Sequence, residues 1–207
     1  EKLFYNCSEL ISLNLKNWNT SNIINMNNMF NSCLKIAELD LSNFDTSNVT
    51  TMVGMFSTCK QLKKLNVAGF NTSQVTNMSK LFSDCNSLTE LDLSKWNTSK
   101  VTYMDAMFIN CNSLTNLDLS SWNTENLKSV VNMFQYCINL VSVKLDNLKT
   151  DKITNMQGMF HNCRSLTEID LSDFDTKNVT NMAAMFQQCT NLKTIYVKEY
   201  DSTRKTG

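Results

Sequence analysis

The sequence predicts an α/β repeat solenoid: a curved, right-handed stack of about eight coils, with parallel strands on its concave side and short helical or 3-10 segments on its convex side. Cysteines recur every 26 residues without insertion or deletion, which is typical of stacked repeats. Each unit joins a Leu-x-Leu pair to a Met-x-x-Met-Phe-x-x-Cys segment. Proline is absent, as expected where central strands need every N–H group. The units begin at Cys7, Cys33, Cys59, Cys85, Cys111, Cys137, Cys163 and Cys189.

The unbroken period predicts one domain, a single solenoid over residues 1–207. No linker-like stretch is visible before about Asp201, and residues 201–207 are expected to be the end of the array or a tail. Leu3 and Phe4 already fit the last third of a unit. The chain is therefore expected to start in mid-repeat, as a piece of a longer protein.

A strand is expected in each unit shortly after the cysteine. In the fourth unit Leu91 and Leu93 flank one polar residue, and this period of two places both side chains on one face. A large and usually aromatic residue such as Trp96 follows. Such a column could stack sugars or bases, but its regular place after Leu-x-Leu is interpreted first as core or turn packing. Equivalent strands should pair in parallel about 4.8 Å apart, and parallel crossovers are overwhelmingly right-handed.

The Met-Phe-Cys segment predicts one face of a short helix, because its apolar residues are three, four and seven positions apart. Thr50 or Thr76 would cap such a segment. Since packed helices lie about 8–10 Å apart, this side of the stack should be wider than the strand side. The strand side would then be concave.

The cysteines are expected to be reduced, buried core residues. Equivalent side chains of stacked coils stay about one coil apart, which is too far for a disulfide. A zinc site is disfavoured because metal-binding cysteines usually form close pairs and the only histidine is His161. The spacing of the methionines also favours core filling over a soft-metal site. No metal or cofactor is predicted.

Charge and motifs exclude several classes of function. The 19 basic and 19 acidic residues balance, so no basic field favours nucleic acid. No apolar run is long enough for this segment to insert in a membrane, and no secretory signal is present. No nucleophile elbow, phosphate loop or acid–base pair is found, so the chain is not expected to be an enzyme.

Polar residues next to the strand leucines are the candidate binding site. They should point out of the concave face and form a strip that is mostly acidic, which favours a basic or cation-bearing partner. The alternative is an ordinary solvated sheet face. The candidate partner-binding residues are Glu38, Asp40, Glu90, Asp92, Asn116, Asp118, Glu168 and Asp170.

Several Asn-x-Ser/Thr triplets could accept glycans if the chain enters a eukaryotic secretory route. A repeat rich in Asn, Ser and Thr also generates such triplets without any selection for glycans, so both interpretations stay open. Asn6 overlaps the cysteine motif and would be a poor acceptor. The triplets begin at Asn6, Asn19, Asn48, Asn71, Asn77, Asn97 and Asn178.

The pattern C-x-x-L-x-x-L-D-L-S-x-W/F-N/D-T-S-x-V-T-N-M-x-x-M-F, found with small departures from Cys85 to Phe108, resembles the BspA-like class of leucine-rich repeats. That class occurs in bacterial surface proteins and lipoproteins and in some protozoan surface proteins. The resemblance covers essentially the whole chain. It implies an extracellular or cell-surface solenoid used for adhesion or partner binding, without shared catalytic residues. Val130, Leu148 and Lys149 depart from the pattern around the sixth coil.

Two functions are compatible with these observations. The leading hypothesis is a cell-surface binding or adhesion module whose concave face contacts a macromolecular partner, either protein or glycan. The alternative is a structural protein. Open solenoid ends expose apolar core and strand edges, through which copies could assemble head-to-tail into fibres.

Overall fold

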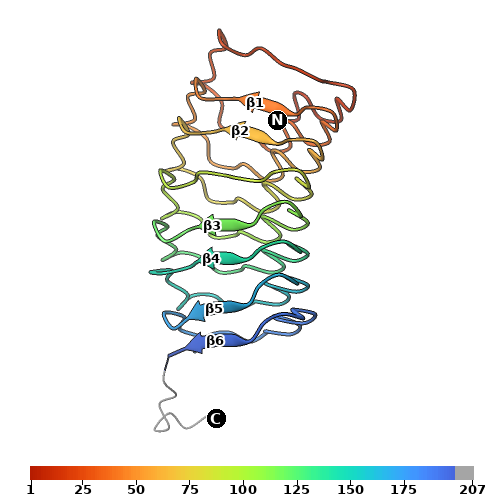
Figure 1. Ribbon diagram of the computed structural model, residues 1–207. Coiled ribbons are helices and arrows are strands. Elements are labelled where there is room, and N and C mark those ends of the chain that lie inside the picture. Colours follow the sequence, from red (N-terminus) through yellow and green to blue (C-terminus); the bar gives the residue numbers. More distant parts are fainter. Residues whose placement is uncertain (199–207) are drawn as a thin grey trace.

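The computed structural model describes residues 1–198, and the predicted tail at 201–207 lies outside the described residues. The chain winds as a continuous stack of coils, with its strands above one another on one side (Figure 1). The strands are β1 (Glu38–Asp40), β2 (Lys64–Asn66), β3 (Asn116–Asp118), β4 (Ser142–Lys144), β5 (Glu168–Leu171) and β6 (Thr194–Val197). They form three two-stranded parallel sheets, β1-β2, β3-β4 and β5-β6. The prediction of parallel strands is confirmed.

The Met-Phe-Cys segments are not helical: residues 1–198 contain no helix. Met26–Met29 and Phe30–Cys33 instead form tight turns, each closed by a bond from the fourth amide to the first carbonyl. The third residues, Asn28 and Ser32, have φ of 55° and 63°, as in type II turns. Two turns in tandem return an apolar residue every three or four positions, which is the spacing that suggested a helix.

Each coil repeats this pair of left-handed residues. The first column contains Lys2, Asn28, Gly54, Lys80, Ala106, Asn132, Gly158 and Ala184. The second, four residues later, contains Asn6, Ser32, Thr58, Asp84, Asn110, Tyr136, Asn162 and Gln188. Gly and Asn tolerate this conformation, whereas Thr58 is β-branched and therefore strained.

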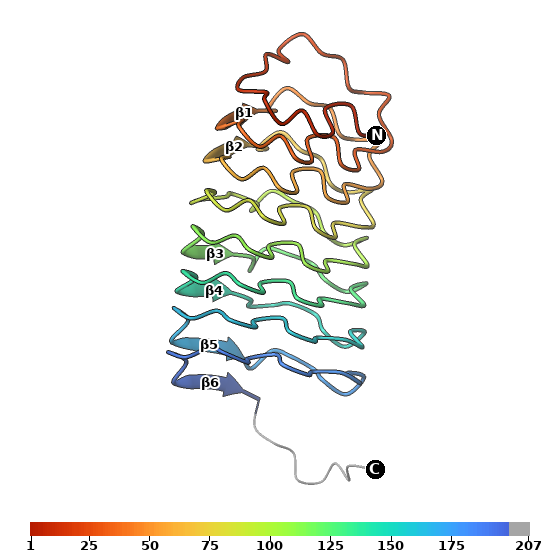
Figure 2. The same ribbon diagram turned by 90° about the vertical axis from the view of Figure 1, so that its right-hand side faces the viewer.

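The turns are joined from coil to coil by their own ladder of hydrogen bonds. The amides of Asn28, Phe30 and Ser32 donate to carbonyl oxygens 25 residues further along, at 2.8–2.9 Å. A column of single parallel bridges runs beside them from Asn25 to Asn181. Because the turn side is bonded like a sheet, it is not widened to the spacing of packed helices. Neither Figure 1 nor Figure 2 shows the marked bend that such widening would cause.

The core consists of columns of identical or similar side chains. Phenylalanine rings stack from Phe4 to Phe186 with neighbouring centroids 5.3–5.8 Å apart. Buried threonines at the corners, from Thr20 to Thr150, donate to backbone carbonyls of the next coil at 2.8–3.0 Å. These inward-facing columns leave the strand side and the corners to present variable side chains on a fixed frame.

Within residues 1–198 the structure has no helix with the length and apolar character needed to cross a membrane.

Candidate functional site

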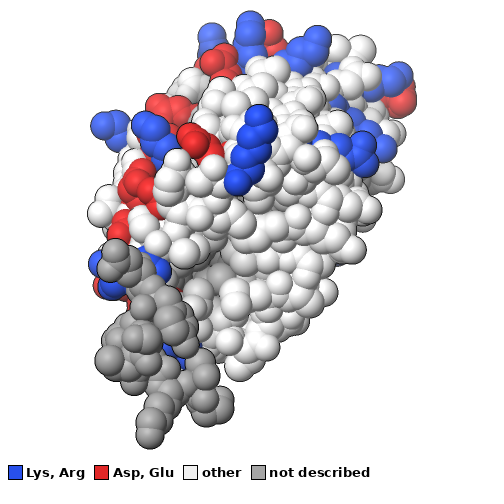
Figure 3. All heavy atoms as spheres, turned by 60° about the horizontal axis from the view of Figure 1, so that its bottom comes forward, with Lys and Arg blue, Asp and Glu red and all other residues white. Residues whose placement is uncertain are grey.

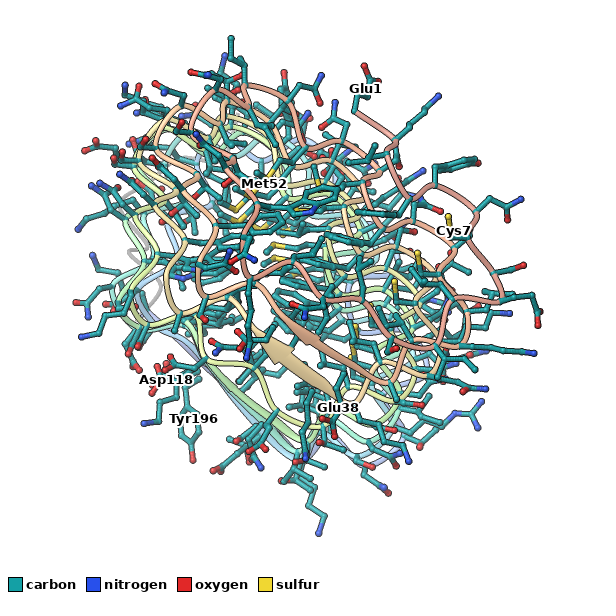
Figure 4. All side chains as sticks on the ribbon, turned by 90° about the horizontal axis from the view of Figure 1, so that it is seen from above. Glu1, Cys7, Glu38, Met52, Asp118 and Tyr196 are labelled. Atoms are coloured by element: carbon teal, nitrogen blue, oxygen red, sulfur yellow. The ribbon has the colours of Figure 1, made fainter. Side chains whose placement is uncertain are left out.

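The candidate residues lie on one surface, which we call the strand face. In β1 and β3 the central leucine is buried while the residues on either side are exposed. Register places Glu38 beside Lys64 and Asp118 beside Lys144 on neighbouring strands. Seen from above, Glu38, Asp118 and Tyr196 project from this side, whereas Met52 points into the stack and Cys7 lies elsewhere on the coil (Figure 4).

A hollow of about 640 Å³, which we call the strand-face groove, crosses coils 2 to 5 of this surface. Leu39, Leu65 and Leu91 contribute its apolar part. The groove brings together five of the candidate residues, and Asp118 and the two from β5 do not line it. The five that it contains are Glu38, Asp40, Glu90, Asp92 and Asn116.

The groove crosses an interruption of the strand ladder. Residues 90–92 have the same repeat position as β1 and β2, yet they form no strand with β2 or β3. In coil 4 the indole Nε1 of Trp96 is also buried without a hydrogen-bond partner among the described residues. Coil 4 is therefore held less completely on its strand side than its neighbours, and it carries Glu90 and Asp92 into the groove.

The aspartates of the strip have a local structural role that was not among the predictions from the sequence. Asp92 Oδ1 accepts a hydrogen bond from the Ser94 amide at 2.9 Å, and Asp118 Oδ1 accepts one from the Ser120 amide at 3.0 Å. Asn14 and Asn66 make the same bond at their positions. The Asp-x-Ser and Asn-x spacing, typical of a side chain closing a turn, was the available signal.

These bonds lower the pKa values of the carboxyl groups. The Ser120 hydroxyl and amide, followed by Lys144, lower the pKa of Asp118 to about 2. The Ser94 amide and hydroxyl lower the pKa of Asp92. Asp40 and Asp170 are affected in the same direction by Ser42 and Ser172. All four aspartates are thus anionic at neutral pH while they close their turns.

Ion pairs neutralise only part of the strip. Lys64 Nζ lies 3.0 Å from Glu38, and Lys144 Nζ lies 3.1 Å from Asp118. Glu90 and Asp92 form no ion pair with any residue of the described chain. Four carboxylates and one ammonium line the groove. Asp40 in coil 2 likewise forms no ion pair with any described residue, so the uncompensated negative charge of the groove lies on coils 2 and 4, with two of its three carboxylates on coil 4.

Charge is distributed unevenly over the molecule. In the view that brings the C-terminal end forward, acidic and basic side chains gather toward the upper and left edges (Figure 3). A broad area of the same view carries no charged side chain. On the face seen in this view, charged side chains therefore occupy only part of the surface.

The cysteine side chains form a column that is mostly buried inside the stack. The described cysteines are free, and six of them are buried. From Cys33 onward each Sγ donates to the phenylalanine carbonyl oxygen 29 residues earlier, at 3.0–3.2 Å. Desolvation raises the pKa of Cys137 to about 12. Among residues 1–198 no group of three His, Cys, Asp or Glu side chains could hold a metal ion. The redox state of the cysteines stays a prediction.

This stack of coils defines the protein as a leucine-rich-repeat solenoid, and solved structures share its fold. A leucine-rich repeat protein from Bacteroides ovatus matches with a TM-score of 0.56 and 20% identity, over 83% of this chain and 40% of that one. The leucine-rich repeat protein of Treponema pallidum matches with a TM-score of 0.54 and 18% identity, over 83% of this chain and 72% of that one. The BspA-like resemblance is confirmed at the level of the fold.

The chain belongs to the family described as "Mycoplasma protein of unknown function, DUF285", which matches residues 1–116, 64–143 and 104–206. No curated protein matches it. The chain spans less than half of the Bacteroides ovatus protein.

Proposed function

We propose that the chain is a binding module of a cell-surface protein, and that the strand-face groove holds an extended, basic segment of a protein partner. The observation that carries the proposal is the coincidence of a groove with unpaired carboxylates at Glu90 and Asp92. The cell-surface location and the adhesive role rest on the BspA-like resemblance. The strip stays the candidate site, with its centre on coil 4.

The groove fits an extended peptide in length and chemistry. Four coils at the spacing of parallel strands extend over about 14 Å, which corresponds to about four or five residues of extended chain. Leu65 and Leu91 offer apolar surface to the stems of lysine or arginine side chains, whose charged ends can reach the carboxylates. Complementary charge of this kind increases the association rate and specificity more than it increases affinity.

The test is the affinity of a lysine-rich peptide for the wild type and for two charge-neutral variants, Glu90→Gln and Asp92→Asn. Asp92→Asn keeps a side-chain oxygen for the Ser94 amide, as Asn66 does at its own position, so the turn is preserved. We expect each variant to weaken binding about three- to tenfold in low salt and to reduce the salt dependence.

The matched control is Glu168→Gln in β5, which removes the same charge outside the groove. It should leave affinity nearly unchanged. Equal weakening by Glu168→Gln would show that the peptide responds to overall charge, and it would contradict binding in the groove. Binding that is unaffected by both groove variants would refute the proposal.

A second proposal is assembly through the ends of the stack. Leu3, Ile11 and Ile24 are exposed at the N-terminal end of the stack, and Met182 and Val197 are exposed at the C-terminal end of its described part. Apolar core and strand edge at both ends suit stacking of a second copy. Sedimentation velocity across a concentration series should then show growing species. A monomer at every concentration would exclude this alternative for residues 1–207.

A further inference from the structure

The sixth coil, which begins at Cys137, differs from the others at the two corners that follow its strand. Elsewhere among residues 1–198, the corner beyond the aromatic column is closed by an Asn or Asp whose Oδ1 accepts the amide two residues later, at 3.0–3.1 Å. In the sixth coil Lys149 occupies that position. A lysine cannot accept a hydrogen bond. The Asp151 amide consequently has no hydrogen-bond partner among the described residues.

The preceding corner has changed in the same way. Lys144 stands where Asp118 and Asp170 close the turn in the neighbouring coils. Three residues after Lys144, Asn147 has φ of 66°, a left-handed conformation that no other described coil has at this position. Two acceptors have thus been replaced by two cations in this one coil.

A hollow of about 590 Å³, which we call the sixth-coil hollow, lies beside these changes, between the corners of coils 5 and 6. Lys149, Asp151 and Lys152 belong to its wall. Across from them the wall includes Trp122, Asn123 and Glu125 from coil 5. Pockets of this size hold small ligands through an apolar part and a few convergent polar groups.

We propose that the sixth-coil hollow binds an acidic saccharide residue, a uronate. Its carboxylate takes the place of the missing Asn or Asp oxygen, accepts the Asp151 N–H and faces the ammonium groups of Lys149 and Lys152. The carboxylates of Glu125 and Asp151 accept hydrogen bonds from the sugar hydroxyls. A simple anion would be repelled by those two carboxylates, whereas a ligand with one carboxylate and several hydroxyls uses both kinds of group.

This site is separate from the strand-face groove, so each of the two proposals can be refuted without affecting the other. None of the residues that line the groove lines the hollow. The groove is acidic and suits a cation, whereas the hollow has the two lysines and the unpaired amide that an anion requires.

The test is isothermal titration of the whole chain with glucuronate, glucose and acetate. We expect glucuronate to bind at least tenfold more tightly than glucose or acetate. Lys149→Asn restores the side-chain acceptor and should reduce glucuronate binding to the level of glucose, while raising the thermal unfolding midpoint. Lys152→Gln, which leaves the turn alone, should weaken glucuronate binding severalfold.

Lys95→Asn is the matched control, because it removes an exposed lysine from coil 4 and should change nothing at the hollow. Equal affinity for glucuronate and glucose, or full glucuronate binding by Lys149→Asn, would overturn the proposal. Acetate binding as tight as that of glucuronate would overturn the saccharide assignment, because the sugar ring would then contribute nothing.

Discussion

Gly54→Ala should destabilise the stack, although the same change within a helix would stabilise it. Gly54 is the third residue of the first turn of its tandem pair and has φ of 60°. A Cβ atom placed there would lie 2.6 Å from Oδ1 of Asn28 in the coil above. The substitution therefore forces alanine into a left-handed conformation and displaces a neighbouring side chain.

The cost has two parts. A left-handed conformation costs a non-glycine residue about 1–2 kcal/mol. Moving Asn28 also disturbs the bond that its Oδ1 accepts from Asn31 Nδ2 at 3.0 Å, worth up to about 1 kcal/mol. Gly54→Ala should thus reduce the free energy of unfolding by about 1–3 kcal/mol. In a helix the same change would increase the free energy of unfolding by about 1 kcal/mol, so the sign of the change distinguishes tandem turns from a helix.

Urea unfolding followed by circular dichroism measures the effect, with an expected decrease in midpoint of about 0.5–1 M. Lys80→Gly is the matched control, because Lys80 has the equivalent position in the next coil and φ of 57°. It should be neutral or stabilising here, whereas in a helix it would destabilise. A stabilised Gly54→Ala together with a destabilised Lys80→Gly would refute the tandem-turn description.

Three further outcomes are expected. The pKa of Asp118 is lower in the folded than in the unfolded chain, so its stabilising contribution is present above about pH 4 and is lost as the pH falls toward 2. Asp118→Asn keeps the side-chain oxygen for the Ser120 amide. It should therefore flatten the curve of urea midpoint against pH in that range. Trp96→Phe should leave the stability unchanged or increase it, because it removes a buried Nε1 that has no hydrogen-bond partner among the described residues. Trp122→Phe should lower the free energy of unfolding by about 1 kcal/mol, because it removes the 3.4 Å hydrogen bond to the Leu93 carbonyl. Thermal unfolding measures both effects. Native protein should expose to a thiol reagent only the two half-buried cysteines, and denatured, non-reduced protein should give eight free thiols; near-zero thiols after denaturation would contradict the reduced column. The two that should react are Cys7 and Cys189.

The stacking of coils could be predicted because its cause is visible in a single sequence. The fixed period of the cysteines requires equivalent residues to repeat their environment, and the alternation around Leu91 and Leu117 marks the strand side. The helical interpretation failed because apolar spacing reports which side chains point inward, and tandem turns satisfy the same spacing. The discriminating sign was the Gly and Asn content of the left-handed columns, as at Gly54 and Asn110.

The exposure of the candidate residues could be predicted from the sequence, whereas their contacts could not. Period-two alternation places Glu90 and Asp92 outward. It does not show that Asp92 closes a turn or that Lys64 neutralises Glu38, because both depend on the backbone path and on register. For the sixth-coil hollow, the only sign in the sequence was that Leu148 and Lys149 depart from the repeat pattern. Its unpaired Asp151 amide becomes apparent only by comparison with the same corner in the other coils.

The most direct test of the binding account is an amide NMR titration of the chain with the lysine-rich peptide. We expect chemical-shift changes concentrated in β1, β2 and residues 90–92, with the turn columns around Asn28 and Gly54 unaffected. Asp92→Asn should reduce the changes at those strand positions. Shifts concentrated on the turn side, or spread evenly over the acidic residues of all coils, would contradict it.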